Sequence, residues 1–164
     1  MQELMSGNEA IARGAVEAGV HYATGCPGTP STEILENIGS YPESDIVAEW
    51  ATNEKVSLDV AIGASFAGVR SFVAMKHVGL NVALDALMSF TYIGVNGGLV
   101  IYVADDPGVS AGMCEQDTRG LALMSDLPIL EPATVAIHHD VFVYFGVPAA
   151  LAPHTQVFVG PLAI

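Results

Sequence analysis

Two carboxylates stand close together in the segment Glu49-Trp50-Ala51-Thr52-Asn53-Glu54. Glu54 falls in the first turn of a predicted helix, where the helix dipole favours a negative charge. Stabilising the start of the helix is the commoner use of such a residue. The functional alternative is a carboxylate at the edge of a ligand cleft, where burial would raise its pKa and suit it to acid–base catalysis.

A loop with the sequence GCPGTP occupies residues 25–30. Its two prolines make the loop stiff, and its two glycines allow the backbone to approach a ligand closely. The hydroxyl of Thr29 could donate a hydrogen bond to a carboxylate or carbonyl, although composition alone favours an ordinary strand-to-helix turn. No GK[ST] follows the loop and it is not a GxGxxG, so neither common nucleotide-binding motif is present.

Two basic residues, Lys76 and His77, follow the predicted strand that ends at Met75. A ligand with anionic parts would favour these groups at the end of a strand. The alternative is a solvated lysine beside an ordinary loop histidine. Because lysine is rare in this chain, we weigh the two possibilities equally.

Further polar residues follow the most apolar strand pattern. Asp105 and Asp106 could bind Mg²⁺, but Asp-Asp-Pro-Gly is more typical of a turn in which Asp accepts from backbone amides. Arg119 could meet a carboxylate. The sequence His138-His139-Asp140 has no partner ligands at metal-site spacing. We therefore predict no metal site in this chain.

An alternation of strand and helix patterns positions these residues. Strands are predicted at 20–24, 45–49, 71–75, 99–104 and about 128–130, and helices between a capping box at Ser6 and a stop at Gly19, from 31 or 32 to 38, and at 53–67, 81–92 and 115–124. Strand starts recur about every 25–30 residues, as in the βαβ units of a parallel sheet. Ligands of such sheets bind at the carboxyl ends of strands, which here means loops 25–30, 50–54, 75–80 and 104–119.

Composition fits one α/β domain with an apolar surface to cover. Hydrophobic residues make up 51% of the 164 residues and charged residues 14%, so apolar surface is buried in the sheet or against a partner. Residues 133–164 contain one acidic residue and neither lysine nor arginine. This tail is predicted either to hold strands near 141–145 and 156–159 or to remain unpacked.

Charge and cysteine usage exclude several classes of protein. The net charge of −13, with five Lys and Arg residues, is unsuited to nucleic-acid binding. No apolar run reaches the roughly 18–20 residues of a membrane helix, and the first residues lack the pattern of a signal peptide. Cys26 and Cys114 form no CxxC motif and no disulfide framework. We therefore expect a soluble protein of the reducing cytoplasm that does not bind membranes.

Five segments, in this order, resemble the thiamine-diphosphate-dependent 2-oxoacid:ferredoxin oxidoreductases, and specifically the N-terminal pyrimidine-binding (Pyr) domain of the indolepyruvate ferredoxin oxidoreductase α subunit. They are MSGNEAIARGAVEAGV, TGCPGTPSTEILE, EWATNEKV, AIGASFAGVRSFVAMKHVGLN and GGLVIYVADDPG. The resemblance covers about residues 5–132. It implies a three-layer, parallel-sheet thiamine diphosphate-binding fold for residues 1–132 and leaves 133–164 as a poorly matching tail.

The resemblance also implies roles for particular residues. Glu54 matches the catalytic glutamate that hydrogen-bonds N1′ of the aminopyrimidine and favours the imino tautomer, whose N4′ removes the thiazolium C2 proton. Thr29 matches a position near the substrate carboxyl or the cofactor, and Arg119 is assigned to substrate binding. The implied cofactor-binding residues are Pro27, Gly28, Thr29, Lys76, His77, Val78 and Gly79.

The implied reaction is oxidative decarboxylation of an aryl pyruvate to an acyl-coenzyme A. Iron–sulfur clusters take up the electrons, and the cofactor supplies the electron sink. This chain contains no GDG motif for Mg²⁺ and the cofactor diphosphate, and no cysteine cluster. The implied partners are therefore a diphosphate-binding domain or subunit, a β subunit and ferredoxin, in a homo- or hetero-oligomer, and the isolated chain is expected to be inactive.

The sequence departs from the family pattern at two places in the predicted site. Cys26 replaces a tyrosine, and residues 109–114 interrupt the expected run before Glu115. Two alternatives therefore stay open. One is a Pyr-only subunit of a thiamine-dependent decarboxylase of the sulfopyruvate or phosphonopyruvate type, and the other is an inactive truncated domain.

Overall fold

A parallel β-sheet forms the middle layer of the computed structural model, which describes residues 4–42, 45–106, 108–109, 113–131 and 156–159. The strands are β1 Tyr22–Gly25, β2 Val47–Trp50, β3 Ser71–Lys76, β4 Leu99–Ala104, β5 Ile129–Leu130 and β6 Gln156–Val159. The six strands lie in the order β2-β1-β3-β4-β6-β5, and every pairing between neighbours is parallel. The predicted α/β fold with a parallel sheet is confirmed.

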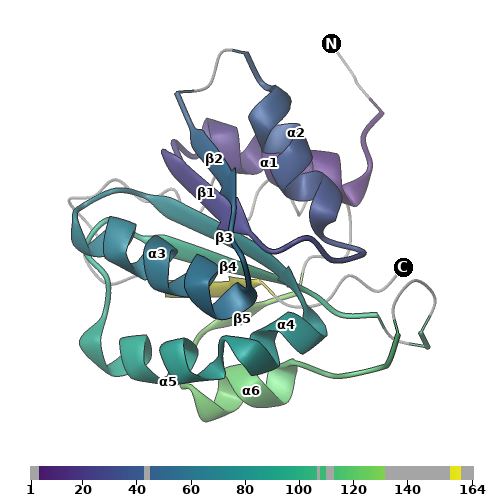
Figure 1. Cartoon of the computed structure of the whole chain (residues 1–164), viewed down its shortest axis with the longest axis vertical. Helices are drawn as coiled ribbons and strands as arrows, with labels where there is room; N and C mark the ends of the chain where they lie inside the picture. Colours follow the sequence, from purple (N-terminus) through teal and green to yellow (C-terminus); the bar gives the residue numbers. More distant parts are fainter. Residues whose placement is uncertain (1–3, 43–44, 107, 110–112, 132–155, 160–164) are drawn as a thin grey trace.

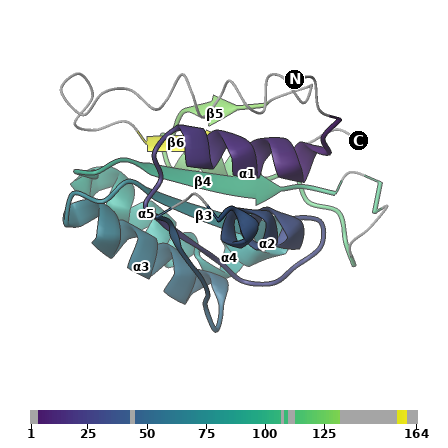
Figure 2. The ribbon, with the colours of Figure 1, turned by 90° about the horizontal axis from the view of Figure 1, so that it is seen from above.

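Helices cover both faces of this sheet (Figure 1). They are α1 Gly7–Glu17, α2 Thr32–Ser40, α3 Glu54–Phe66, α4 His77–Val82, α5 Leu84–Ile93 and α6 Arg119–Met124. Helices α1 and α2 pack on one face, and α3 to α6 contribute to the core on the other. Figure 2 shows the first face from above, with α1 lying across β4.

The central strands are buried on both sides, as the continuous apolar run at 99–104 predicts. Alternate residues enter opposite cores: Phe72, Ala74, Tyr102 and Ala104 face α1 and α2, whereas Val73, Met75, Ile101 and Val103 face α3 to α6. Fully burying one large apolar side chain contributes about 1.5–3 kcal/mol to folding. The two cores therefore hold the strand ends, and the residues that follow them, in a defined register.

The start and end of α1 agree with the sequence prediction. The backbone N–H of Ser6 donates to Glu9 Oε2 at 2.6 Å, and the N–H of Glu9 donates to Ser6 Oγ at 3.3 Å, which completes a capping box. Gly19 follows the helix with φ +73°, a left-handed conformation that glycine adopts without strain.

Two helices differ from their predicted bounds. The helix expected at 81–92 begins at His77 and is divided at Ala83 into α4 and α5, so the predicted loop 75–80 is largely helical. The reason is that the extended Lys76 turns the chain directly from β3 into α4. Helix α6 begins at Arg119 rather than at 115, because the side chain and the backbone of Thr118 bond to Asp105.

The tail is described only in part. The strand predicted near 156–159 is confirmed as β6, which pairs with β4 and with β5. The strand predicted near 141–145 lies outside the described residues. In the part of the chain that the structure describes, no helix combines the length and the apolar character that a membrane crossing requires.

Candidate functional site

Three segments that are distant in sequence meet where the central strands end. Strand β1 leads into loop 26–31. Its neighbours β2 and β3 lead into the start of α3 and the start of α4, respectively. Parallel strands bring their carboxyl ends to one edge of a sheet, which is where ligands of such folds bind. At this edge Glu54 lies against Gly79, and Lys76 lies against Gly28.

Glu54 is held at the first position of α3. The side chain of Asn53 caps the helix by accepting from the N–H of Val56 at 3.0 Å, as is typical of Asn before a helix. The half-buried Glu54 side chain lies against the bare backbone of Gly79. A Cβ at position 79 would lie 2.5 Å from Glu54 Cγ and 2.6 Å from Oε1. Position 79 therefore has room for the carboxylate only because it is a glycine.

Cys26, which directly follows β1, lies beside Glu54. This proximity was not predicted from the sequence. Burial raises the pKa of the Cys26 thiol, and the negative charge of Glu54 and a hydrogen bond to it raise this pKa further. The thiol is therefore held neutral beside the carboxylate. In the sequence, Cys26 stands where the resembled family has a tyrosine. This difference marks Cys26 as unusual but does not show that it lies beside Glu54.

Backbone and hydroxyl contacts order the loop that precedes α2. The N–H of Gly28 donates to Thr32 Oγ1 at 2.8 Å, and the carbonyl of Gly28 accepts from Ser31 N at 2.8 Å and Ser31 Oγ at 2.9 Å. Asn8 of α1 donates to the carbonyl of Pro30 at 2.9 Å. Thr29 is exposed at the tip of this ordered loop, and none of the described residues hydrogen-bonds its hydroxyl.

Lys76 ends β3 opposite this loop and is half-buried. A Cβ at Gly28 would lie 3.1 Å from Lys76 Cδ and 3.3 Å from Cγ, so the aliphatic stem of the lysine packs along the Gly28 backbone. Lys76 and the loop of Thr29 are thus joined, as the prediction of one shared site requires. Pro27 is exposed and Val78 is half-buried, and their predicted cofactor contacts stay predictions.

His77 is completely buried, unlike the half-buried Lys76 and Val78 on either side of it. Its Nε2 lies 2.8 Å from the carbonyl oxygen of Cys114, and its Nδ1 lies 3.3 Å from that of Ala104. Both ring nitrogens face backbone acceptors, so neither is left for a ligand. The structure therefore gives His77 the role of tying α4 to the 105–118 segment, and its predicted cofactor contact is untested.

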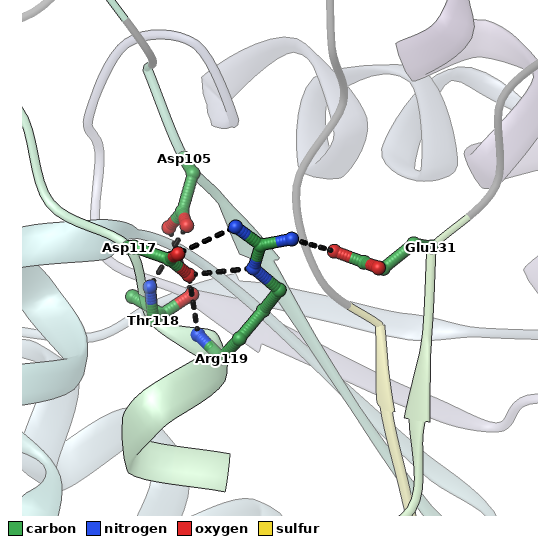
Figure 3. Close-up of polar contacts among 5 residues, drawn as sticks. All are labelled: Asp105, Asp117, Thr118, Arg119 and Glu131. Atoms are coloured by element: carbon green, nitrogen blue, oxygen red, sulfur yellow. Dashed lines mark hydrogen bonds and ion pairs between the residues drawn. The ribbon is translucent and has the colours of Figure 1, made fainter. Parts of the chain in front are cut away.

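The segment between β4 and α6 is held by two further side-chain pairs. The carboxylate of Asp105 accepts from Thr118 N at 2.9 Å and from Thr118 Oγ1 at 2.8 Å (Figure 3). Asn81 and Gln116 exchange amide hydrogen bonds of 2.8 and 3.0 Å. Burial raises the pKa of Asp105, and the hydrogen bonds from Thr118 oppose this rise. The amide that Asp105 accepts from lies 13 residues along the chain, whereas the prediction was a bond to an amide within the Asp-Asp-Pro-Gly turn.

Arg119, predicted to bind substrate, is engaged by two carboxylates at the start of α6 (Figure 3). Its Nε and Nη2 donate to the two carboxylate oxygens of Asp117 at 2.8 and 2.6 Å, and its Nη1 lies 3.6 Å from Glu131 Oε1. Among the described residues, no hydrogen bond or ion pair joins Arg119 to Glu54 or Thr29. Its substrate role stays a prediction, and a substrate would have to compete with Asp117.

Replacing Thr118 by Val tests whether Asp105 holds the segment through a charged hydrogen bond. Burial holds the folded-state pKa of Asp105 above the ordinary 3.8, so its contribution to stability is largest when it is protonated and falls as the pH rises through the folded pKa. Losing the hydroxyl donor raises that pKa further. We expect Thr118→Val to lower the unfolding free energy by about 1.5–3 kcal/mol near pH 7 and by much less near pH 3.

Urea unfolding at the two pH values measures this difference. Thr91→Val is the matched control, since its hydroxyl donates to the carbonyl of Met88 and touches no carboxylate in the described contacts. The control should change stability equally at both pH values. An equal loss at both values for Thr118→Val would contradict the role of the Asp105 charge.

The described residues form no cluster of side chains that could hold a metal ion. No three His, Cys, Asp or Glu side chains of residues 4–42, 45–106, 108–109, 113–131 and 156–159 gather as metal ligands would. The convergent groups are instead a carboxylate, an ammonium, a hydroxyl and bare glycine backbone. Such a set suits an organic ligand with both proton-exchanging and anionic parts.

Comparisons with known proteins identify relatives for most of the chain. It is 46% identical over 142 residues to the indolepyruvate oxidoreductase subunit IorA of Pyrococcus abyssi, and 43% identical over 162 residues to that of Archaeoglobus fulgidus. These alignments cover 86% and 92% of this chain. The 2-oxoglutarate synthase subunit KorA of A. fulgidus is 32% identical over 142 residues, which cover 81% of this chain and 40% of KorA. No protein-family model matches the chain.

A solved structure shares the fold. A 2-oxoglutarate:ferredoxin oxidoreductase from Magnetococcus marinus, with 2-oxoglutarate, coenzyme A and succinyl-CoA bound, superposes with a TM-score of 0.80 at 23% identity. The match covers 96% of this chain and 29% of that one. Likewise, the present chain spans 22% and 26% of the two IorA subunits. It therefore corresponds to one region of much longer relatives.

Proposed function

Most of this chain is homologous to one region of the IorA subunits of indolepyruvate oxidoreductases, and from this we propose that it forms the pyrimidine-binding half of a thiamine diphosphate site in a 2-oxoacid:ferredoxin oxidoreductase. The observation that carries the proposal is the position of Glu54. Its carboxylate lies at the carboxyl edge of the parallel sheet, half-buried against Gly79 and beside the ordered loop 26–31. The homologous IorA and KorA proteins are both named as subunits of 2-oxoacid enzymes.

The donors at this edge fit the pyrimidine end of the cofactor. Glu54 can share a proton with the ring nitrogen N1′, and the bare backbone of Gly79 gives the carboxylate room to hold its place at this edge. When bound, thiamine diphosphate supplies the carbon nucleophile and the electron sink of the reaction. The protein's part at this wall is to orient the ring and to hold the proton at N1′. Cys26 adds no charge beside Glu54, because its thiol stays protonated.

The site as described is one wall, and a partner region must supply the other. Helix α3 carries Glu54 at its first position and lies at the surface in both views (Figures 1 and 2). Its inner side buries Leu58, Ala61 and Ile62, whereas Val56 and Val60, which lie one turn apart on its outer side, expose 40% and 43% of their surface. Two exposed valines that are neighbours on one face of a helix form a small apolar strip, which suits contact with another region.

We assign this outer row of α3, defined as Val56 and Val60, to the diphosphate-binding region of the complete enzyme. The row begins in the first turn of α3, at the end of the helix that carries Glu54, so a region docked there would lie beside the site. Its relatives are about four times longer than this chain, which supplies the chain length for such a region. A β subunit and ferredoxin are the further partners we propose for the complete assembly.

A charge in the outer row should weaken this association without unfolding the domain. Val60→Glu keeps helix propensity and adds repulsion to an acidic chain. We expect the unfolding free energy to change by less than about 0.5 kcal/mol, because Val60 is largely exposed. We expect the affinity for the separately produced diphosphate-binding region to fall about 10-fold or more. Titration calorimetry with thiamine diphosphate and Mg²⁺ present measures this affinity.

Leu123→Glu is the matched control for this experiment. Leu123 is an apolar residue of α6 with 73% of its surface exposed, on a different helix. Its substitution should leave the association unchanged. If both variants bind as wild type does, the outer row of α3 is not the docking surface.

The products of the complete enzyme test the reaction we propose. Indolepyruvate, coenzyme A and ferredoxin should give the acyl-coenzyme A, carbon dioxide and reduced ferredoxin. Release of an aldehyde without coenzyme A would instead indicate the decarboxylase alternative, and absence of turnover would indicate an inactive domain. We propose the cytoplasm as the compartment, since two free thiols and ferredoxin chemistry both fit a reducing environment.

A further inference from the structure

Lys76 differs from every other cation of this chain. All five Lys and Arg residues lie within the described ranges. Arg13 pairs with Glu17 at 2.5 Å, Lys55 with Asp59 at 2.9 Å and Arg119 with Asp117 at 2.6 Å, and Arg70 donates to the carbonyl of Ala18. Among the described residues, no hydrogen bond or ion pair engages the ammonium group of Lys76. The unpaired cation therefore lies in the candidate site, in a chain of net charge −13.

The position of Lys76 is fixed by packing rather than by charge. Its stem contacts Gly28, whose hypothetical Cβ would lie 3.1 Å from Lys76 Cδ. Gly28 is in turn ordered by the hydrogen bonds to Thr32 and Ser31. A side chain that is already held in place loses less conformational entropy when a ligand binds. Lys76 is thus a preorganised cation that no carboxylate of the described residues pairs with.

Its surroundings select the kind of anion. Thr29 follows Gly28 directly and keeps a hydroxyl that no described residue engages. An ammonium donor at the end of β3 and a hydroxyl donor on the loop packed against it match a small carboxylate, which has two acceptor oxygens. Glu54 marks the pyrimidine end of the cofactor in our proposed function. The diphosphate belongs to the partner region, so the anion nearest to this wall is the substrate.

We propose that Lys76, together with Thr29, binds the carboxylate of the 2-oxoacid substrate. This inference rests on the proposed function and refines the predicted cofactor role of Lys76. The ammonium charge selects an acid over a neutral analogue of the same shape. Lys76 then determines which compounds enter the site, whereas Glu54 determines whether the bound compound reacts.

The test compares an acid with its amide in the complete oxidoreductase that carries this domain. Indolelactate, a 2-hydroxy acid without the reactive carbonyl, and indolelactamide serve as probes in titration calorimetry. Wild type should bind the acid about 10- to 100-fold more tightly than the amide. Lys76→Met should lose this preference and raise the KM for indolepyruvate by a similar factor, and Lys76→Arg should recover most of both.

Two further measurements separate this inference from other roles. Lys55→Met removes a cation that is paired with Asp59 and Asp85, and it should leave the preference for the acid intact. The concentration of thiamine diphosphate that gives half-maximal activity should be unchanged in Lys76→Met. If that concentration rises while the acid preference persists, Lys76 binds the cofactor diphosphate and the inference is wrong.

The outcome for Lys76 is independent of the outcome for the proposed function. Turnover without thiamine diphosphate would show that the proposed function is wrong. The comparison of acid with amide would still show whether Lys76 binds the substrate carboxylate. An unchanged acid preference in Lys76→Met, in an enzyme that requires thiamine diphosphate, would overturn only the role of Lys76. The arginine variant confirms that a loss comes from the charge and not from misfolding.

Discussion

Glu54→Gln is expected to lower kcat of the complete enzyme about 10²- to 10⁴-fold, the range for loss of a positioned acid–base group. Gln has the same shape as Glu and fits beside Gly79, but its amide can neither give a proton to N1′ of the cofactor nor take one from it. The fold should be unaffected, since the helix start is capped by Asn53 rather than by Glu54. Thiamine-dependent reduction of ferredoxin measures the rate, and urea unfolding measures the stability.

Exchange of the cofactor C2 proton for deuterium gives a second readout, which is independent of the electron acceptor. We expect slow exchange in Glu54→Gln and fast exchange in wild type. Glu49→Gln is the control: this neighbouring carboxylate is exposed and accepts from the Tyr22 hydroxyl at 2.6 Å. It should behave as wild type does. Equal exchange in Glu54→Gln and wild type would show that Glu54 is not the group that controls this proton.

Gly79→Ala is expected to reduce activity by a factor of about 10² or more, even though it adds a single methyl group. The new Cβ would lie 2.5 Å from Glu54 Cγ and 2.6 Å from Oε1, so the carboxylate has to move. A displacement of about 1 Å of a catalytic group can cost that much in rate. Steady-state kinetics should show the loss in kcat rather than in KM for the 2-oxoacid.

The cause can be isolated by a double-mutant cycle on stability. In wild type, Gly79→Ala should be destabilising because of the clash with Glu54. In a Glu54→Ala background the clash is absent, and the same change should be neutral or stabilising, since Ala favours a helix over Gly by up to about 1 kcal/mol. Gly63→Ala in α3 is the control, because a Cβ there would meet nothing within 4 Å. Equal effects of Gly79→Ala in both backgrounds would contradict the contact.

Local patterns in the sequence were sufficient to predict the fold class and most of its helices and strands. The capping box at Ser6, the stop at Gly19 and the apolar run at 99–104 predicted elements that the structure contains. These signals depend on residues a few positions apart, so they can be read without knowledge of the fold. The spacing of strands and helices likewise predicted the parallel sheet. The sequence also placed Glu54 at a helix start and Thr29 and Lys76 after strands.

Tertiary structure decided which of these residues share a site. Gly79 is a neighbour of Glu54, and Gly28 of Lys76, only because β1 lies beside β3 and beside β2 in the sheet. His77 follows Lys76 directly, yet packing buries its ring against the carbonyl of Cys114. Arg119 lies 3.6 Å from Glu131 because the chain after α6 turns back through β5. None of these contacts has a signal in local sequence spacing.

The sequence by itself determined the elements, the strand ends that carry chemistry and the scarcity of cations that makes Lys76 informative. Strand order, helix packing and burial then decided that no described carboxylate pairs with Lys76, that Cys26 stays neutral and that position 79 must be a glycine. The physical reason is that propensity and periodicity act over a few residues. Charge pairing and steric exclusion act between residues that only the folded chain brings together.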